Sequence, residues 1–211
     1  MWGRTERKDA VEAILESYDV GVTAIDTAPV YGQGTSEEIV GEAIKDLDRS
    51  KVQILTKFGM RWDLPSPKGD FAFKSQDNNG TPLDIYRYAG KESIILECEN
   101  SLRRLRTDYI DLYQIHWPEP DEEIEEGWTA VADLIKAGKV RHGGVSNFSV
   151  AQLERAQAIH PITSLQPPYS MLNRAIEAEI VPWCEAHGVG ILACAACRRQ
   201  HGDVEMPLVE A

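Results

Sequence analysis

Four residues in this sequence have side chains and spacing suited to proton transfer. Asp26 lies near the end of the β-favouring run Val22–Thr27, and Tyr31 follows five residues later in a loop with Pro and Gly. Lys57 and His116 each come directly after a later apolar run. Because the carboxyl ends of parallel strands lie at one edge of a sheet, we expect the four side chains to converge.

The chemistry of such a cluster follows from ordinary side-chain pKa values. A tyrosine phenol has a pKa of about 10, too high for efficient proton exchange near neutral pH. We expect the Lys57 ammonium to lower the pKa of Tyr31, with Asp26 holding the lysine charged and in place. His116 at the same rim can hydrogen-bond a substrate oxygen. Together these groups suit polarising and protonating a carbonyl while a hydride reaches its carbon.

Each residue alone has a simpler structural explanation. A strand-end Asp often caps a turn, a loop Tyr packs, and a Lys or His is commonly satisfied by solvent or backbone. Four such residues at the ends of three successive strands favour a functional site. Asn147 and Gln166 follow two further strands and suit a carboxamide ligand such as nicotinamide, although either one alone is a routine turn residue.

The elements that would position these residues alternate between strand and helix. Helical stripes of apolar residues begin near Lys8, Lys91 and Glu122, and capping-box spacing occurs at Thr35/Glu38 and Ser149/Gln152. Six strands are expected, ending near Asp26, Lys57, His116, Asn147, Gln166 and Ala193. No Gly-x-Gly-x-x-Gly pattern follows the first strand, so the alternation predicts a parallel α/β barrel rather than a dinucleotide-binding open sheet.

One segment departs from this alternation. Residues 60–88 are rich in Pro, Gly, Asp and Asn and are predicted to be irregular. They form either a surface insertion or a flap over a substrate. The aromatic residues Trp62, Phe71, Phe73, Tyr86 and Tyr88 make the flap as plausible as the insertion.

Composition excludes some classes of partner. The net charge of −12 over 211 residues argues against nucleic acid or an anionic membrane as the main partner. The sequence has no apolar run long enough for a membrane span and no signal-peptide pattern, and its four cysteines suit a reduced, cytoplasmic setting. The Cys194/Cys197 spacing lacks a second ligand pair, so no metal site is expected.

Five motifs, in order, resemble those of the aldo-keto reductase family. They are IDTAPVYG, ILTKFG, LRRLRTDYIDLYQIHWP, GKVRHGGVSNFS and SLQPPYSMLNR. The long segment after Lys57 resembles bacterial members with an extended loop after the third barrel strand. The resemblance implies a (β/α)₈ barrel of the TIM type, of which about six of eight strands are present, and NADPH-dependent reduction of an aldehyde or ketone to an alcohol.

The resemblance also assigns roles to individual residues. Tyr31 matches the general acid, Lys57 its pKa-lowering partner, Asp26 the carboxylate that pairs with the lysine, and His116 the residue that orients the carbonyl. Ser146, Asn147 and Gln166 match contacts to the nicotinamide carboxamide, and Trp117 matches a position facing the substrate pocket. A small-molecule carbonyl is therefore the expected substrate, and the sequence leaves the oligomeric state open.

The two ends of the chain depart from the family pattern. Only seven residues precede Lys8, where a first strand and hairpin are expected, and Cys194 lies where an aromatic residue would stack on nicotinamide. We therefore expect a partial barrel over residues 1–193 and an unrelated tail over 194–211, as in a truncated or frameshifted reading frame. A catalytically silent barrel with a binding or regulatory role, or a non-functional gene fragment, is the alternative.

Overall fold

The computed structural model describes residues 6–194, and six parallel strands form its main sheet. These strands are β1 (Ala24–Asp26), β2 (Gln53–Phe58), β6 (Ile110–Ile115), β7 (Val140–Ser146), β8 (Ser164–Gln166) and β9 (Gly190–Ile191), hydrogen-bonded in that order. All pairs are parallel. The six predicted strands are confirmed, and each lies within about three residues of its expected end.

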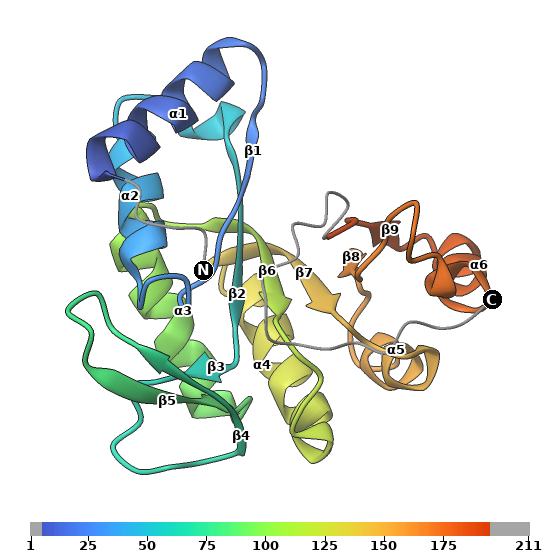
Figure 1. The fold of residues 1–211 in the computed structure, drawn as a ribbon. Coiled ribbons are helices and arrows are strands. Elements are labelled where there is room, and N and C mark those ends of the chain that lie inside the picture. Colours follow the sequence, from blue (N-terminus) through green and yellow to red (C-terminus); the bar gives the residue numbers. More distant parts are fainter. Residues whose placement is uncertain (1–5, 195–211) are drawn as a thin grey trace.

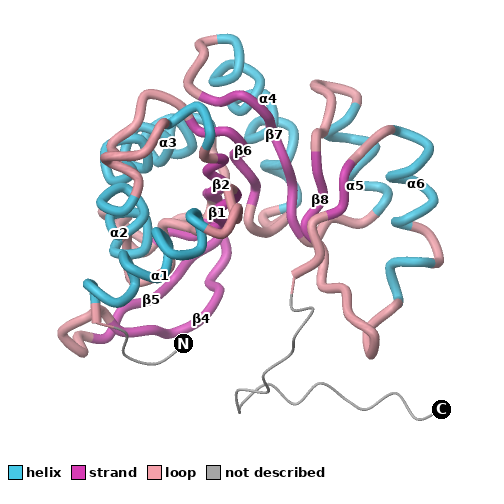
Figure 2. The backbone as a smooth tube through the Cα atoms, turned by 90° about the horizontal axis from the view of Figure 1, so that it is seen from above, coloured by secondary structure: helices cyan, strands magenta, loops and turns pink. Residues whose placement is uncertain are grey.

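One helix precedes β1, and one helix lies between each pair of successive strands of this sheet. They are α1 (Arg7–Asp19), α2 (Thr35–Ala43), α3 (Lys91–Leu105), α4 (Ile124–Lys136), α5 (Val150–Gln157) and α6 (Ile180–His187), with 3₁₀ turns at Arg49–Lys51, Asp121–Glu123 and Ala175–Glu177. Figure 1 shows the alternation along the chain, and Figure 2 shows the strands on an arc with α2 to α6 outside it. The sheet is thus a curled, incomplete (β/α)₈ barrel.

Burial falls from the middle of the sheet to its ends. Every residue of β6 is buried, whereas β1 is mostly exposed and α1 contains no fully buried residue. The apolar face predicted for α3 is confirmed, since Ile94, Cys98 and Leu105 are fully buried. β1 and β9 have one neighbour each within residues 6–194, so each has lower burial than a strand between two neighbours.

The segment predicted to be irregular is instead a small antiparallel sheet. It contains β3 (Met60–Arg61), β4 (Asp70–Gln76) and β5 (Pro82–Arg87), in the order β3-β5-β4. The β4–β5 turn is a hairpin signal that the sequence carries: Asp77 Oδ1 accepts hydrogen bonds from Asn79 N and Thr81 N, both at 2.8 Å, and Gly80 has φ +85°. This sheet lies near the carboxyl end of β2 (Figure 1).

Only one of the two expected capping boxes forms. At Ser149 the side chain accepts a hydrogen bond from Gln152 N, and Gln152 Oε1 accepts one from Ser149 N, as predicted. The Thr35/Glu38 box is wrong, because α2 begins at Thr35 itself after Gly34, whose φ is +96°. The Thr35 hydroxyl instead accepts a hydrogen bond from Asn78 Nδ2 in the β4–β5 turn, at 2.9 Å.

A buried arginine and a buried carboxyl group join the small sheet to the barrel. Arg61 on β3 lies 3.7 Å from Glu97 Oε1 on α3 and also donates to the Ser93 hydroxyl. Glu97 Oε2 accepts a hydrogen bond from Gly59 N at 3.1 Å. Burial raises the pKa of Glu97 to about 7, although the nearby Arg61 charge opposes that shift.

We expect the stability that Glu97 contributes to depend on pH. The native state keeps the Glu97 proton up to about pH 7, whereas the unfolded chain releases it near 4.5, so this stability is lost as pH rises through 7. Between about pH 4 and pH 8, the wild type should therefore lose about 3 kcal/mol of unfolding free energy relative to Glu97→Gln. Urea unfolding of both proteins across pH measures it, and a constant difference would contradict the raised pKa.

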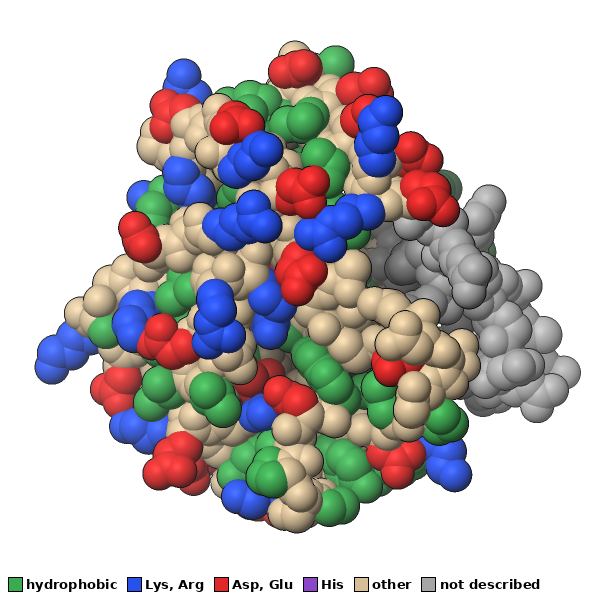
Figure 3. Space-filling model, turned by 90° about the vertical axis from the view of Figure 1, so that its left-hand side faces the viewer, with side chains coloured by type: hydrophobic (Ala, Val, Ile, Leu, Met, Phe, Trp, Pro, Cys, Tyr) green, Lys and Arg blue, Asp and Glu red, His purple; other side chains and the backbone are tan. Residues whose placement is uncertain are grey.

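The outer surface on the side of α1 and α2 carries charges of both signs. Figure 3 shows basic and acidic side chains interspersed there. Arg7 pairs with Glu38 at 3.2 Å and with Glu42 at 2.9 Å, joining α1 to α2. This face therefore has no continuous basic field of the kind that binds nucleic acid. No helix in the described part of the chain is long and apolar enough to cross a membrane.

Candidate active site

A buried lysine and a carboxylate pair at the carboxyl ends of β1 and β2. Lys57 Nζ donates to Asp26 Oδ1 at 2.8 Å, to Asp26 Oδ2 at 2.9 Å and to the Thr27 carbonyl at 3.1 Å. The Lys57 side chain is 3% exposed and that of Asp26 is 40% exposed. Thr56 contacts α2 and Phe58 lies in the core, so the alternation along β2 turns Lys57 to the opposite, concave face.

Tyr31 and His116 lie at the same edge of the sheet. Their ring centroids are 5.8 Å apart with the planes at 82°, an edge-to-face contact. Lys57 Nζ lies 5.5 Å from the centroid of the Tyr31 ring. The structure therefore brings together all four residues predicted to form the proton-transfer cluster.

The predicted direction of the Tyr31 pKa shift is wrong in this structure. Burial raises the pKa of Tyr31 to about 12, and the negative charge of Asp26 adds to the effect. The sequence argument counted Asp26 only as the partner of Lys57, and it left out the burial of the phenol and the direct effect of the Asp26 charge on it, both of which raise the pKa of Tyr31. Tyr31 is consequently a neutral phenol at physiological pH, the form that can donate a proton.

Burial and the Lys57 charge lower the pKa of His116 to about 3, so its imidazole is neutral at physiological pH. We expect the ring-nitrogen NMR shifts of His116, one of five histidines, to stay constant from about pH 5 to pH 8. Since its unfolded pKa is 6.5, stability from this site is retained above that value and lost as pH falls toward 3. A titration of His116 near pH 6.5 in the folded protein would contradict its burial beside Lys57.

Three polar residues lie at the adjoining strand ends, and all three were predicted to contact a carboxamide. Ser146 is 2% exposed, and its hydroxyl has no hydrogen-bond partner within residues 6–194. Asn147 has φ +62°, and its Nδ2 donates to the His116 carbonyl at 3.1 Å. Gln166 Nε2 donates to Asp26 Oδ2 at 3.2 Å. The orphaned Ser146 hydroxyl, at the edge where Lys57 and Asp26 lie, fits an amide ligand.

Trp117 and Cys194 lie at the rim of this region. Trp117 is 38% exposed, and the Arg87 guanidinium of β5 lies 5.4 Å from its ring. Cys194 N donates to the Pro167 carbonyl at 3.0 Å, which continues the β8–β9 pairing. Cys197 and the rest of the predicted tail, residues 195–211, lie outside the described residues.

The sequence did not indicate every contact that organises the cluster. The Thr27 carbonyl accepts a hydrogen bond from Lys57, and the Thr27 and Ser36 hydroxyls share a hydrogen bond of 2.7 Å across the Tyr31 loop. Both are common residue types that give no signal without the fold. The Gln166–Asp26 bond was likewise unforeseen, since it joins residues 140 positions apart.

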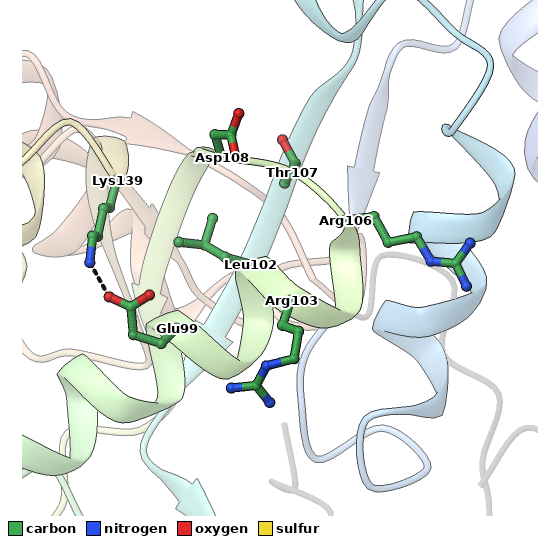
Figure 4. A pocket seen from close by; sticks show the side chains of 7 residues that line it. All are labelled: Glu99, Leu102, Arg103, Arg106, Thr107, Asp108 and Lys139. Carbon is green, nitrogen blue, oxygen red and sulfur yellow. Dashed lines mark hydrogen bonds and ion pairs between the residues drawn. The ribbon is translucent and has the colours of Figure 1, made fainter.

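A hollow on the protein surface lies apart from the proton-transfer cluster. A surface hollow with Glu99 and Lys139 paired on one side lies between the end of α3 and the start of β6 (Figure 4), at the amino ends of the strands. It is therefore separate from the cluster. Among residues 6–194, no three His, Cys, Asp or Glu side chains are grouped so as to hold a metal ion.

Comparisons with known proteins identify relatives of this chain. The family model described as "Aldo/keto reductase family" matches residues 1–198. Aldo-keto reductase YhdN of Bacillus subtilis is 42% identical over 193 residues, covering 91% of this chain and 53% of the relative. The NADH-specific methylglyoxal reductase of Escherichia coli is 35% identical, covering 89% of this chain and 56% of the relative. The chain thus spans about half the length of these relatives.

Solved structures show the same likeness. The glycerol dehydrogenase of Gluconobacter oxydans aligns with a TM-score of 0.80 and 37% identity, over 98% of this chain and 61% of that one. An aldo/keto reductase from Klebsiella pneumoniae, solved with NADP and acetate, aligns with a TM-score of 0.71 and 31% identity, over 90% of this chain and 58% of that one. With the strand order and the family match in agreement, the chain belongs to the aldo/keto reductase family.

Proposed function

We propose that this chain carries the proton-transfer site of an NADPH-dependent reductase that converts an aldehyde or ketone to an alcohol. The observation that supports the proposal most strongly is the buried Lys57–Asp26 ion pair beside the Tyr31 ring, with His116 in edge contact with that ring. A hydroxyl donor, a buried cation and a neutral imidazole at one strand edge suit a carbonyl oxygen that gains negative charge.

The reaction that these residues support begins with a bound carbonyl. The neutral His116 imidazole donates a hydrogen bond to the substrate oxygen and orients it toward the phenol. Tyr31 gives its hydroxyl proton to that oxygen as negative charge develops there. The Lys57 ammonium then stabilises the resulting phenolate, while Asp26 keeps the lysine in place. A nicotinamide cofactor, when bound, supplies the hydride.

The residues that would hold the cofactor lie on β7 and β8 or just after them. We propose that the Ser146 hydroxyl, the Asn147 amide and the Gln166 amide bind the nicotinamide carboxamide, and that Trp117 forms one wall of the substrate pocket. The unpartnered Ser146 hydroxyl supports this assignment because buried polar groups are nearly always hydrogen-bonded. The Klebsiella neighbour solved with NADP supports a nicotinamide ligand, with NADPH as the proposed form.

Cofactor binding provides the direct test. We expect NADPH to quench the tryptophan fluorescence of the full chain saturably, and NADPH absorbance to fall when an aldehyde is added. Titrating NADH in parallel tests the proposed preference. Absence of binding at millimolar concentrations of both cofactors would refute the enzymatic proposal for this chain.

The same measurement tests the alternative, a catalytically silent barrel with a binding or regulatory role. That alternative is favoured by β1 and β9, each of which has one strand neighbour within residues 6–194 and an open edge on the other side. Saturable cofactor binding followed by turnover would rule it out.

A further inference from the structure

Glu37 is a fully buried carboxylate that has no part in the proposed chemistry. It lies in the first turn of α2 and is 0% exposed. Its Oε1 accepts a hydrogen bond of 2.6 Å from the Thr56 hydroxyl on β2, and its Oε2 accepts one of 2.6 Å from Arg104 Nε on α3. Both oxygens are therefore held by directional bonds to different elements.

The Tyr31 loop leads directly into α2, the helix that carries Glu37. The loop is braced by hydrogen bonds from Gly34 N to the Pro29 carbonyl at 2.7 Å and from Ser36 N to the Tyr31 carbonyl at 3.2 Å. Arg104 also packs beneath the loop, because a Cβ at Gly34 would lie 2.7 Å from Arg104 Cδ. The ion pair that fixes Glu37 thus occupies the space against which the loop rests.

The other partner of Glu37 precedes the catalytic lysine. Thr56 and Lys57 are adjacent on β2 and point to opposite faces of the sheet, one toward α2 and the other toward Asp26. The Glu37–Thr56 bond therefore fixes the start of α2 against the strand that carries Lys57. The Tyr31 loop is thus connected to Lys57 through the start of α2, the Glu37–Thr56 hydrogen bond and the β2 backbone.

We propose that Glu37 is a positioning residue that sets the place of Tyr31 relative to Lys57 and His116. The inference rests on the proposed function, since it assigns the network to the geometry of proton transfer. Apolar residues would fill the same space and exclude water, but they would not fix a register between α2, α3 and β2. A displacement of the phenol by about 1 Å is enough to lower turnover severely.

The chain offers a matched control for this proposal. Asp111 on β6 is also a buried carboxylate with arginine partners: Arg49 Nη2 lies at 2.7 Å and Arg141 Nη1 at 3.0 Å. It also accepts a hydrogen bond from Ile54 N at 2.9 Å, near the amino ends of the strands and far from Tyr31. Asp111→Asn should therefore disturb a comparable network without moving the phenol.

The experiment follows Tyr31 itself by ¹⁹F NMR of the full chain labelled with 3-fluorotyrosine. The signal of Tyr31, one of seven tyrosines, is assigned with Tyr31→Phe. In Thr56→Val and Glu37→Gln we expect this signal to move toward the free amino acid and to broaden, while Asp111→Asn leaves it in place. Thr56→Val removes only the bond from Thr56 to Glu37 and keeps the Glu37–Arg104 pair. If Glu37→Gln does not fold, Thr56→Val alone tests whether the network positions Tyr31.

Kinetics give a second readout. If the wild-type chain reduces carbonyls, Thr56→Val should lower kcat by about 10-fold or more with KM within about twofold, and Asp111→Asn should not. An unchanged Tyr31 signal in Thr56→Val, or an equal movement in Asp111→Asn, would overturn the positioning role. A wild-type chain without reductase activity contradicts the proposed function alone, because the NMR result still tests the position of Tyr31.

Discussion

Replacing Tyr31 by Phe is expected to lower kcat/KM for carbonyl reduction by about 100- to 10,000-fold. The substitution removes only the hydroxyl oxygen of Tyr31. The Tyr31 ring lies beside Lys57 and His116, and its hydroxyl keeps its proton at physiological pH. Affinity for NADPH should stay nearly unchanged, since the proposed carboxamide contacts come from Ser146 and its neighbours. Initial rates and a fluorescence titration on the same preparation measure both quantities.

Tyr109→Phe provides the matched control for this variant. Its hydroxyl donates to the Arg49 carbonyl at 3.3 Å, at the other end of the barrel strands, so the same chemical change occurs away from the site. We expect Tyr109→Phe to keep wild-type kinetics. Retention of carbonyl reduction in Tyr31→Phe would exclude Tyr31 as the general acid.

Asp26→Asn is expected to lower the free energy of unfolding by about 2 kcal/mol and to abolish most activity. The reason is an asymmetry in the ion pair. Lys57 is 3% exposed, so a neutral partner leaves an ammonium buried without a counter-charge. The estimate lies below the usual cost for a fully buried pair because the Asp26 side chain is 40% exposed.

The reciprocal variant, Lys57→Met, should also lose activity but less stability. The remaining Asp26 carboxylate reaches solvent and keeps the hydrogen bond from Gln166 Nε2 at 3.2 Å. We expect a loss below about 1 kcal/mol, measured by urea unfolding of both variants. Equal losses in the two variants would contradict the burial asymmetry that places Lys57 inside the site.

The small antiparallel sheet shows where local sequence patterns were misread. Its turn at Asp77–Gly80 and the alternating Phe71 and Phe73 are hairpin signals, but the surrounding Pro, Gly and Asn residues favoured an irregular segment. The attachment of this sheet through Arg61 and Glu97 had no sequence signature. Residues 36 positions apart meet only because the fold places Arg61 on β3 beside the first turns of α3.

The electrostatics of the site are a second property that the sequence did not predict. The residue types predicted a cluster, and Asp26, Tyr31, Lys57 and His116 do converge. The direction of the Tyr31 pKa shift was mispredicted because it depends on how far the phenol is buried and on its distance from the Asp26 charge. Such balances need distances and solvent exposure, and a linear sequence contains neither.

By itself, the sequence determined the β/α alternation, the six parallel strands and the edge at which the polar residues gather. These features depend on local periodicity and on the fixed geometry of parallel strands, so they can be read along the chain. Only the tertiary structure decided which charges neutralise each other, that Tyr31 and His116 are both neutral, and that Glu37 ties the Tyr31 loop to the Lys57 strand. These properties depend on contacts between residues distant in the chain and on the water that those contacts exclude.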